Sequence, residues 1–347
     1  MKQKVTELKI GHAVEDNYFK FPQQLMADIV DALHNSDKVV LDFIEGAALE
    51  ELNYKEKKFL HILKELCERN NWPLDKIQFV SPNLVQNKSV WPSIKLAQYP
   101  DHFLHAQNLQ VNTKKQIDKT FGMFVGRSSW ERLIIGSHIF KHHKDKTIQT
   151  YRNYLDDPGN MLNMDTERLL WNLSVAGRLT KSNLKDIFDF ISEMPFTYNN
   201  KHDRETNLQW DSGALDNDLL ECYNKIFVDV VCEKTIAGKT FFPTEKISRP
   251  LVTKTPFLIM AAPDFIKNLK RLNFRSYNRW WSEDYDQQQG LERAESIQGI
   301  IDDLAKLDKK QLEDMHQQMQ PILEYNYKNY METAPEKIHE VFSQKPI

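Results

Sequence analysis

The sequence has little of what marks a disulfide-stabilised, metal-binding or membrane protein. Its 347 residues include three cysteines, Cys67, Cys222 and Cys232, an odd number without the spacing of metal ligands. So few cysteines favour a reducing compartment. No apolar run approaches the roughly 18 residues that span a bilayer, and the first residues lack the pattern of a signal peptide. We therefore expect a cytoplasmic protein, of a cell or of an infected host cell, with no membrane span.

The chain also lacks a strong excess of charge of either sign. Its 46 Lys and Arg residues against 49 Asp and Glu residues give a net charge of -3. A dedicated duplex-binding protein would carry an overall basic bias, so this balance neither supports nor excludes a nucleic-acid partner. With 41% hydrophobic residues the chain can bury a sizeable core, and its length favours two domains over one.

Strand and helix patterns alternate in a way typical of parallel α/β sheets. Short apolar runs predict buried strands at 38–43, 77–80, 121–125, 226–231 and 257–260. Helical spacing of apolar residues predicts helices at 56–69, 130–142, from Pro263, and from Asp308 to about Lys328 with a kink at Pro321. Because a new strand, turn and helix begins after a polar stretch, we place a domain boundary near residue 118.

One segment, residues 238–279, concentrates positive charge. It holds nine Lys and Arg residues against two acidic ones, +7, so the rest of the chain carries -10. Such a concentration beside buried strands is how a site for a small polyanion would look, and a solvated basic face is the alternative.

Within this segment Thr244, Glu245 and Lys246 predict the start of a helix with Thr244 as N-cap. A helix N-terminus attracts phosphates, and Lys246 would add a cation. Glu245 has acceptors for two ribose hydroxyls, or it merely stabilises its helix. Pro250 is expected to interrupt the helix after little more than one turn.

The ordered series of motifs resembles the C-terminal half of fucosyltransferase-like glycosyltransferases, in the form common in phage and large-virus genomes. The resemblance rests on Phe-Pro-Thr-Glu-Lys-Ile-Ser-Arg-Pro at 242–250, Pro-Phe-Leu-Ile at 256–259, the run 265–274, and Trp-Trp-Ser-Glu-Asp-Tyr-Asp at 280–286. It also takes in the Gly126-Arg127 turn with Arg132 and the closing Tyr-Asn-Tyr at 325–327, and covers roughly residues 119–330. Two departures, Ser282 and the aliphatic stretch 228–231, argue against inferring fucose as the donor sugar.

This resemblance implies a GT-B-like architecture, two Rossmann-like domains with a cleft between them. An acceptor-side domain would take residues 1–118 and a nucleotide-sugar-binding domain residues 119–307, with a helical segment at 308–347 crossing back. The function implied is transfer of a sugar from a UDP- or GDP-sugar to a glycan or other hydroxyl acceptor. No obligatory cofactor or metal is implied. The alternatives are a DNA glycosyltransferase acting on a hydroxymethylated base and a non-catalytic nucleotide-sugar-binding protein.

The donor-binding residues follow from the same resemblance. Lys246 and an arginine of the 126–132 turn, Arg127 or Arg132, would contact the diphosphate, and Glu245 the ribose. Glu233 matches an acidic position of the family pattern. The donor set therefore consists of Arg127, Arg132, Glu233, Thr244, Glu245, Lys246 and Arg249.

We expect a catalytic base near the carboxyl end of the strand 38–43, because ligands of open α/β sheets bind at the carboxyl ends of the strands. Glu45, just before Gly46, could reach into a cleft and take the acceptor's proton, and it resembles an Asp…Glu-Gly box of the phage-type proteins. The alternatives are that Glu45 is a loop carboxylate without chemistry, or that His12 is the base. Asp42 lies one strand position inward and is expected to be structural.

Three further patterns suggest metal ligands without forming a site. Asp216 with Asp218, and Asp284 with Asp286, fit a short Asp-x-Asp pattern of little specificity. His138 and His142 share a helical face, but the sequence offers no neighbouring third ligand, so no zinc site is predicted.

Overall fold

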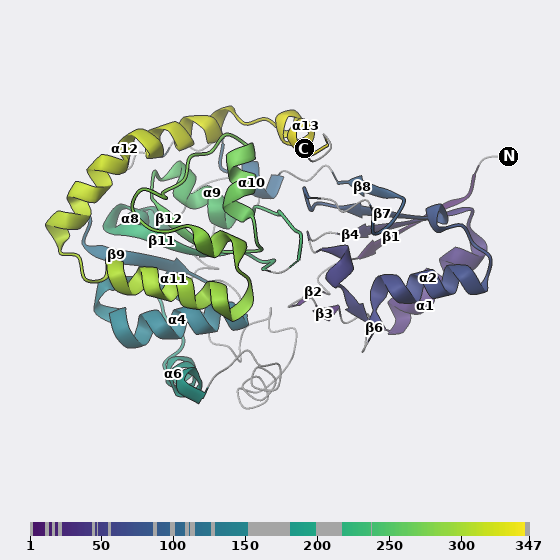
Figure 1. Cartoon of the computed structure of the whole chain (residues 1–347), viewed down its shortest axis with the longest axis horizontal. Coiled ribbons are helices and arrows are strands. Elements are labelled where there is room, and N and C mark those ends of the chain that lie inside the picture. The colour runs from purple at the N-terminus through teal and green to yellow at the C-terminus, as the bar shows by residue number, and fades with distance from the viewer. Residues whose placement is uncertain are drawn as a thin grey trace.

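A computed structural model gives the structure of the chain. The residues that it describes are 3–10, 14–15, 18–19, 23–43, 46, 48–54, 57–85, 89–97, 101–107, 111, 115–125, 129–151, 181–198, 217–236 and 238–343. They form parallel sheets flanked by helices, which confirms the α/β class (Figure 1). Among these described residues, no helix combines the length and the apolar character that crossing a membrane requires.

The first sheet is parallel throughout and has the strand order β1-β4-β7-β8. Its strands are β1 (Val5–Ile10), β4 (Lys38–Phe43), β7 (Ile77–Ser81) and β8 (Ile94–Leu96). The helices α1 (Gln23–Asn35) and α2 (Phe59–Arg69) lie along one face of the sheet (Figure 1). Ile29 and Leu63 from these helices pack with Val39 and Leu41 in one core. The predicted strands at 38–43 and 77–80 and the helix near 56–69 are confirmed.

Short elements complete this part of the chain. A second small sheet has the order β2-β3-β5-β6, and two 3-10 turns and a short helix connect the longer elements. These elements are β2 (Val14–Glu15), β3 (Tyr18–Phe19), η1 (Leu49–Glu51), β5 (Asn53–Tyr54), β6 (Lys57–Lys58), η2 (Leu74–Lys76) and α3 (Asp101–Leu104).

The second large sheet is also parallel and has the order β10-β9-β11-β12. Its strands are β9 (Lys119–Phe124), β10 (Thr147–Thr150), β11 (Ile226–Cys232) and β12 (Phe257–Met260). Every residue of β11 and β12 is buried, because helices cover both faces, as is usual for parallel sheets. The continuous apolar runs at 226–231 and 257–260 reflect that burial.

Helices α4 (Trp130–His143) and α11 (Gly290–Leu304) lie along one face of this sheet, and α9 (Glu245–Val252), α10 (Phe265–Arg271) and α12 (Lys309–Glu332) lie along the other (Figure 1). The remaining described helical segments are η3 (Lys144–Lys146), α6 (Lys181–Ser192), α8 (Asn217–Lys225), η4 (Asp284–Gln287) and α13 (Pro335–Ser343).

The strand order of the second sheet has a reversal. The chain passes from β9 to β10 on one side and then returns past β9 to reach β11 and β12 on the other. In open parallel sheets the connections that leave the carboxyl ends of the two strands at such a reversal go to opposite faces of the sheet, and the crevice between them holds ligands. We call the carboxyl ends of β9 and β11 the switch point.

The C-terminal helices complete the second core. A capping box of Asp308 and Gln311 starts α12, which continues through Pro321 to Glu332, beyond the predicted end near residue 328. The Tyr330 hydroxyl donates to the carbonyl of Phe103 at 2.6 Å. Phe103 therefore packs in the second core, although it precedes the predicted boundary at residue 118. The domain ranges stay a prediction.

A junction joins the two large sheets; it consists of residues 238–242 with Gly46, Asn83 and Leu84. The Asn83 amide donates to the carbonyl of Lys239 at 3.1 Å and accepts from the backbone N–H of Phe241 at 2.9 Å. The backbone N–H of Leu84 donates to the carbonyl of Phe241 at 2.9 Å. The Thr240 hydroxyl donates to the carbonyl of Gly46. Backbone groups far apart in sequence are thus satisfied across the junction.

Gly46 tests this junction. A Cβ atom at residue 46 would lie 2.4 Å from the Cβ and 2.5 Å from the Cγ of Phe242, atoms too near the backbone to swing away. We expect Gly46→Ala to lower the free energy of unfolding by about 1–3 kcal/mol, the usual cost of overpacking. Urea unfolding monitored by circular dichroism measures this change.

Gly299→Ala is the matched control. A Cβ there meets nothing within 4 Å, and the residue lies inside α11. Since alanine forms helices better than glycine, this variant should gain about 0.5–1 kcal/mol. Equal stability of the two variants would contradict the close contact between Gly46 and Phe242.

Candidate functional site

Glu233 and Thr244 form the centre of a polar cluster at the switch point. Glu233 follows β11 directly and its side chain is buried. One of its carboxylate oxygens accepts from the Thr244 backbone N–H at 3.1 Å, and the other accepts from the Thr244 hydroxyl at 2.6 Å. Burial raises the pKa of Glu233 above its ordinary value, although the Lys246 ammonium opposes the shift. A buried carboxylate therefore holds the residue that begins α9.

Thr244 also caps α9, as predicted. Its hydroxyl oxygen accepts from the backbone N–H of Lys246 at 3.3 Å. The expected interruption of the helix at Pro250 is wrong, because α9 continues to Val252. A proline in the second turn removes one backbone donor, and packing of a buried helix tolerates that loss. The anchoring of Thr244 by Glu233 supplies the positioning that a two-turn helix lacks by itself.

Arg132 reaches the switch point from the first turn of α4. Its guanidinium donates to the carbonyl of Cys232, the last residue of β11, at 3.1 Å, and its Nε lies 4.0 Å from a carboxylate oxygen of Glu131. Burial by itself would lower the pKa of Arg132, but Glu131 and, more weakly, Glu233 raise it above its ordinary value. The arginine therefore remains a buried cation that ties α4 to the end of β11.

Glu245 and Lys246 are the members of the cluster that reach solvent. Their side chains are 17% and 23% exposed, and the Lys246 ammonium lies 2.5 Å from a carboxylate oxygen of Glu245. Burial would raise the pKa of Glu245, but Lys246 and then Arg249 outweigh it and hold that pKa well below the usual range. Arg249 itself is 2% exposed, one turn further along α9. The ion pair of Glu245 and Lys246 is thus the part of the cluster that a ligand can meet.

The structure brings together six of the seven residues of the predicted donor set: Arg132, Glu233, Thr244, Glu245, Lys246 and Arg249. Arg127, Glu45 and His12 lie outside the described residues. Gly46, which follows Glu45 in the chain, contacts Phe242, two residues before Thr244. Asp42 is buried next to the last residue of β4, and this burial raises its pKa.

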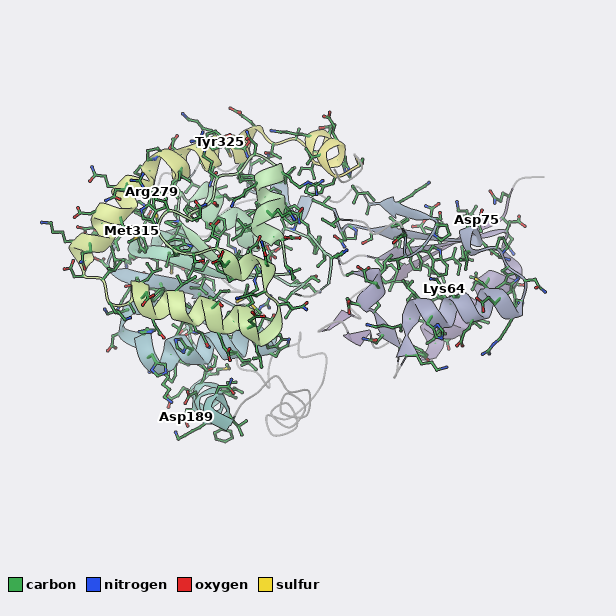
Figure 2. The ribbon with its side chains drawn as sticks, in the orientation of Figure 1. Lys64, Asp75, Asp189, Arg279, Met315 and Tyr325 are labelled. Atoms are coloured by element: carbon green, nitrogen blue, oxygen red, sulfur yellow. The ribbon has the colours of Figure 1, made fainter. Side chains whose placement is uncertain are left out.

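The cationic side chains of residues 238–279 do not form one group but lie at several separate places in the structure. Lys254 lies 2.7 Å from Glu324, and Arg271 lies over the ring of Phe342 on α13. The Arg275 guanidinium lies 3.7 Å from the ring centroid of Tyr325, which Figure 2 labels on α12. These three side chains hold the C-terminal helices against the second sheet. Of the concentrated charge, Lys246 and Arg249 belong to the switch point.

The acidic box at 280–286 has a structural role that the sequence did not reveal. Asp286 accepts from the backbone N–H groups of Ile266 and Lys267 at 2.9 and 3.0 Å, which caps α10. The buried guanidinium of Arg293 lies 3.3 Å from the same carboxylate and donates to the carbonyl of Ile259 at 3.0 Å. A hollow of about 340 Å³ opens beside this box, and none of the described donor residues lines it. No local pattern marks Arg293, because most of its partners are backbone carbonyls.

Removal of the Thr244 hydroxyl tests the anchor. Thr244→Val keeps the side-chain shape but leaves a Glu233 oxygen and the Lys246 N–H without their partner. We expect a loss of about 1–3 kcal/mol in the free energy of unfolding, the cost of an unsatisfied buried group. Thr253→Val, at the other end of α9, removes a hydroxyl whose two partners, the Arg249 carbonyl and the Thr255 hydroxyl, are both neutral, and should cost less. Equal losses in urea unfolding would contradict a special role for Glu233.

Comparison of the chain with protein-family models, with curated proteins and with solved structures finds no match. The resemblance to fucosyltransferase-like glycosyltransferases therefore stays a prediction from the motifs. A proposal about function therefore rests on the geometry at the switch point.

Proposed function

We propose that the protein is a glycosyltransferase that binds a nucleotide-diphosphate sugar, UDP- or GDP-linked, at the switch point of the second sheet. The observation that carries the proposal is the Glu233–Thr244 anchor, which presents the start of α9 with Glu245 and Lys246 at the carboxyl edge of a parallel sheet. Ligands of open parallel sheets bind at such an edge, and phosphates favour helix N-termini. The GT-B-like arrangement, with the first sheet on the acceptor side, belongs to the same proposal.

The ion pair of Glu245 and Lys246 suits a ligand that carries both phosphates and hydroxyls. A diphosphate attracts the Lys246 ammonium, and the Glu245 carboxylate is then available to accept hydrogen bonds from two ribose hydroxyls. The buried residues Arg132, Glu233 and Thr244 position this pair and need not contact the ligand. Arg249 adds positive charge from within the helix. We therefore assign the contacts with the ligand to Glu245 and Lys246, the two side chains of the cluster that reach solvent.

Lys246→Ala tests donor binding. We expect affinity for UDP or GDP, measured by calorimetry, to fall by about 1–3 kcal/mol, the scale of a charge-assisted hydrogen bond. Lys267→Ala is the control, because Lys267 belongs to the same basic segment but is 70% exposed and pairs with Asp264. Unchanged affinity of Lys246→Ala for both nucleotides would overturn the donor site, and an equal loss in both variants would indicate a general effect of charge.

Transfer of the sugar needs a base for the acceptor hydroxyl, and we propose Glu45 for this role. Its neighbour Gly46 contacts the segment that leads into Thr244, which supports placing the acceptor side of the reaction near the start of α9. An acceptor hydroxyl loses its proton as it attacks the sugar, and a carboxylate can accept that proton.

Glu45→Gln separates catalysis from binding. The amide keeps the size of the side chain but cannot accept the proton, so turnover should fall by about 10²–10⁴ while donor affinity holds. Hydrolysis of UDP- and GDP-sugars, followed by mass spectrometry, is the assay. Glu68→Gln, an exposed carboxylate on α2, should keep wild-type turnover. Wild-type turnover of Glu45→Gln would move the search for the base to His12, and binding without any turnover in the wild-type protein would favour a non-catalytic binding protein.

A further inference from the structure

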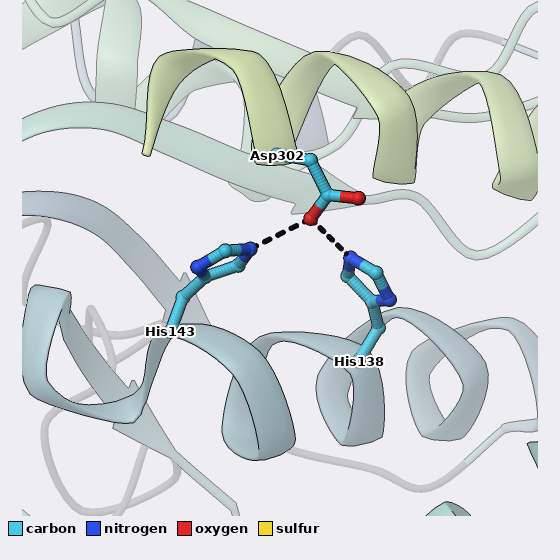
Figure 3. Close-up of side chains that lie close together, drawn as sticks. All are labelled: His138, His143 and Asp302. Carbon is cyan, nitrogen blue, oxygen red and sulfur yellow. Dashed lines mark hydrogen bonds and ion pairs between the residues drawn. The ribbon is translucent and has the colours of Figure 1, made fainter. Parts of the chain in front are cut away.

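Two histidines and an aspartate meet between α4 and α11, on the sheet face that these helices cover. His138 and His143 come from the C-terminal half of α4, and Asp302 comes from α11 (Figure 3). The two Nε2 atoms lie 2.8 and 2.7 Å from the same carboxylate oxygen of Asp302. The sequence showed no third ligand because Asp302 is 159 residues from His143.

The spacing of these atoms is close to that of a metal site. One ligand atom from each residue lies within 4.8 Å of the other two. A tetrahedral zinc ion with bonds of about 2.0–2.2 Å holds its ligand atoms about 3.3 Å apart. The two nitrogen–oxygen distances would therefore lengthen by roughly half an ångström, and the two histidine nitrogens, which lie within 4.8 Å of each other, would come to about 3.3 Å apart.

We propose that His138, His143 and Asp302 bind one divalent first-row transition-metal ion, with zinc as the probe of choice and water as the fourth ligand. Imidazole nitrogen suits zinc, nickel and copper, whereas magnesium and calcium require oxygen ligands. The side chain of Asp302 is 45% exposed, which leaves room for water, and those of the histidines are 17% and 14% exposed. This metal site is separate from the proposed donor site.

The protonation states agree with this proposal. Burial lowers the pKa of His138, although its hydrogen bond to Asp302 opposes the shift, so the imidazole is neutral at pH 7. Burial would raise the pKa of Asp302, but the two histidines outweigh it and keep the carboxylate ionised. Each histidine would bind the ion through Nε2 as a neutral ring that carries its proton on Nδ1.

The proposed ion would join two helices that are distant in sequence. Arg132 stands in the first turn of α4, and His143 is the last residue of the same helix. A metal at the His143 end would fix α4 against α11 and thereby support the helix that carries Arg132. None of the three ligands belongs to the switch point, so the ion would act on α4 from outside the proposed donor site.

Calorimetric titration of the metal-free full chain with zinc tests the site. We expect one ion per chain and a rise in melting temperature of roughly 5 °C at a free zinc concentration of 100 times Kd. Cobalt should give the visible absorption of a tetrahedral complex, and magnesium should not bind. His138→Ala, His143→Ala and Asp302→Asn should each weaken zinc binding by at least about 10–100-fold, the loss produced by removal of even a supporting partner.

His61→Ala is the matched control. His61 lies 2.9 Å from Glu65 on α2, and among the described residues no third histidine, cysteine or carboxylate joins this pair to make a possible metal site. This variant should bind zinc like the wild-type protein. Asp302→Asn keeps the side-chain volume, so circular dichroism of the metal-free variant checks that it is folded. Absence of zinc binding to the wild-type chain, or wild-type affinity for zinc in the three ligand variants, would overturn the proposal.

Discussion

The paired hydrogen bonds from Thr244 to the buried carboxylate of Glu233 are the interaction on which the rest of the candidate site depends. They fix the start of α9 to the end of β11, and the segment before Thr244 runs directly from the junction with the first sheet. A charged acceptor in a buried place makes stronger hydrogen bonds than a neutral one, and it is costly when its donors are lost. One contact therefore positions both a helix terminus and the chain that crosses between the sheets.

The buried and the exposed polar residues of this region do different work. Three charged side chains are almost fully buried and hydrogen-bond to backbone groups or to neighbouring side chains: Arg132, Glu233 and Arg293. Glu245 and Lys246 pair with each other and retain contact with solvent. A rigid buried frame that carries a short exposed ion pair is suited to exchanging partners when a charged ligand arrives, because little of the surrounding structure has to move.

Local sequence patterns predicted the strands and helices, but they could not predict contacts between residues that are distant in the sequence. The strands at 226–232 and 257–260 and the cap at Thr244 follow from runs of a few neighbouring residues. Arg132 meets Cys232 across 100 residues, and Asp302 meets His138 across 164, so no short pattern contains either pair. The excess of positive charge at residues 238–279 is real, but some of these side chains contact aromatic rings and acidic residues of the C-terminal helices. Composition alone cannot show such contacts. The switch point, too, is built from residues that are distant in the sequence, so its function is proposed from its geometry and not from a short pattern.

The junction has a consequence for synthesis of the chain. The first sheet is complete at Leu96, whereas the residues that cover Gly46 and Asn83 begin at Gly238, 142 residues later. At about 5–20 residues per second, the ribosome needs on the order of 7–30 s to supply them. Leu84 packs in the second core, part of which is made only after residue 238. Until residues 238–242 arrive, a nascent chain therefore leaves open to chaperones the groups around Gly46, Asn83 and Leu84 that the finished protein conceals.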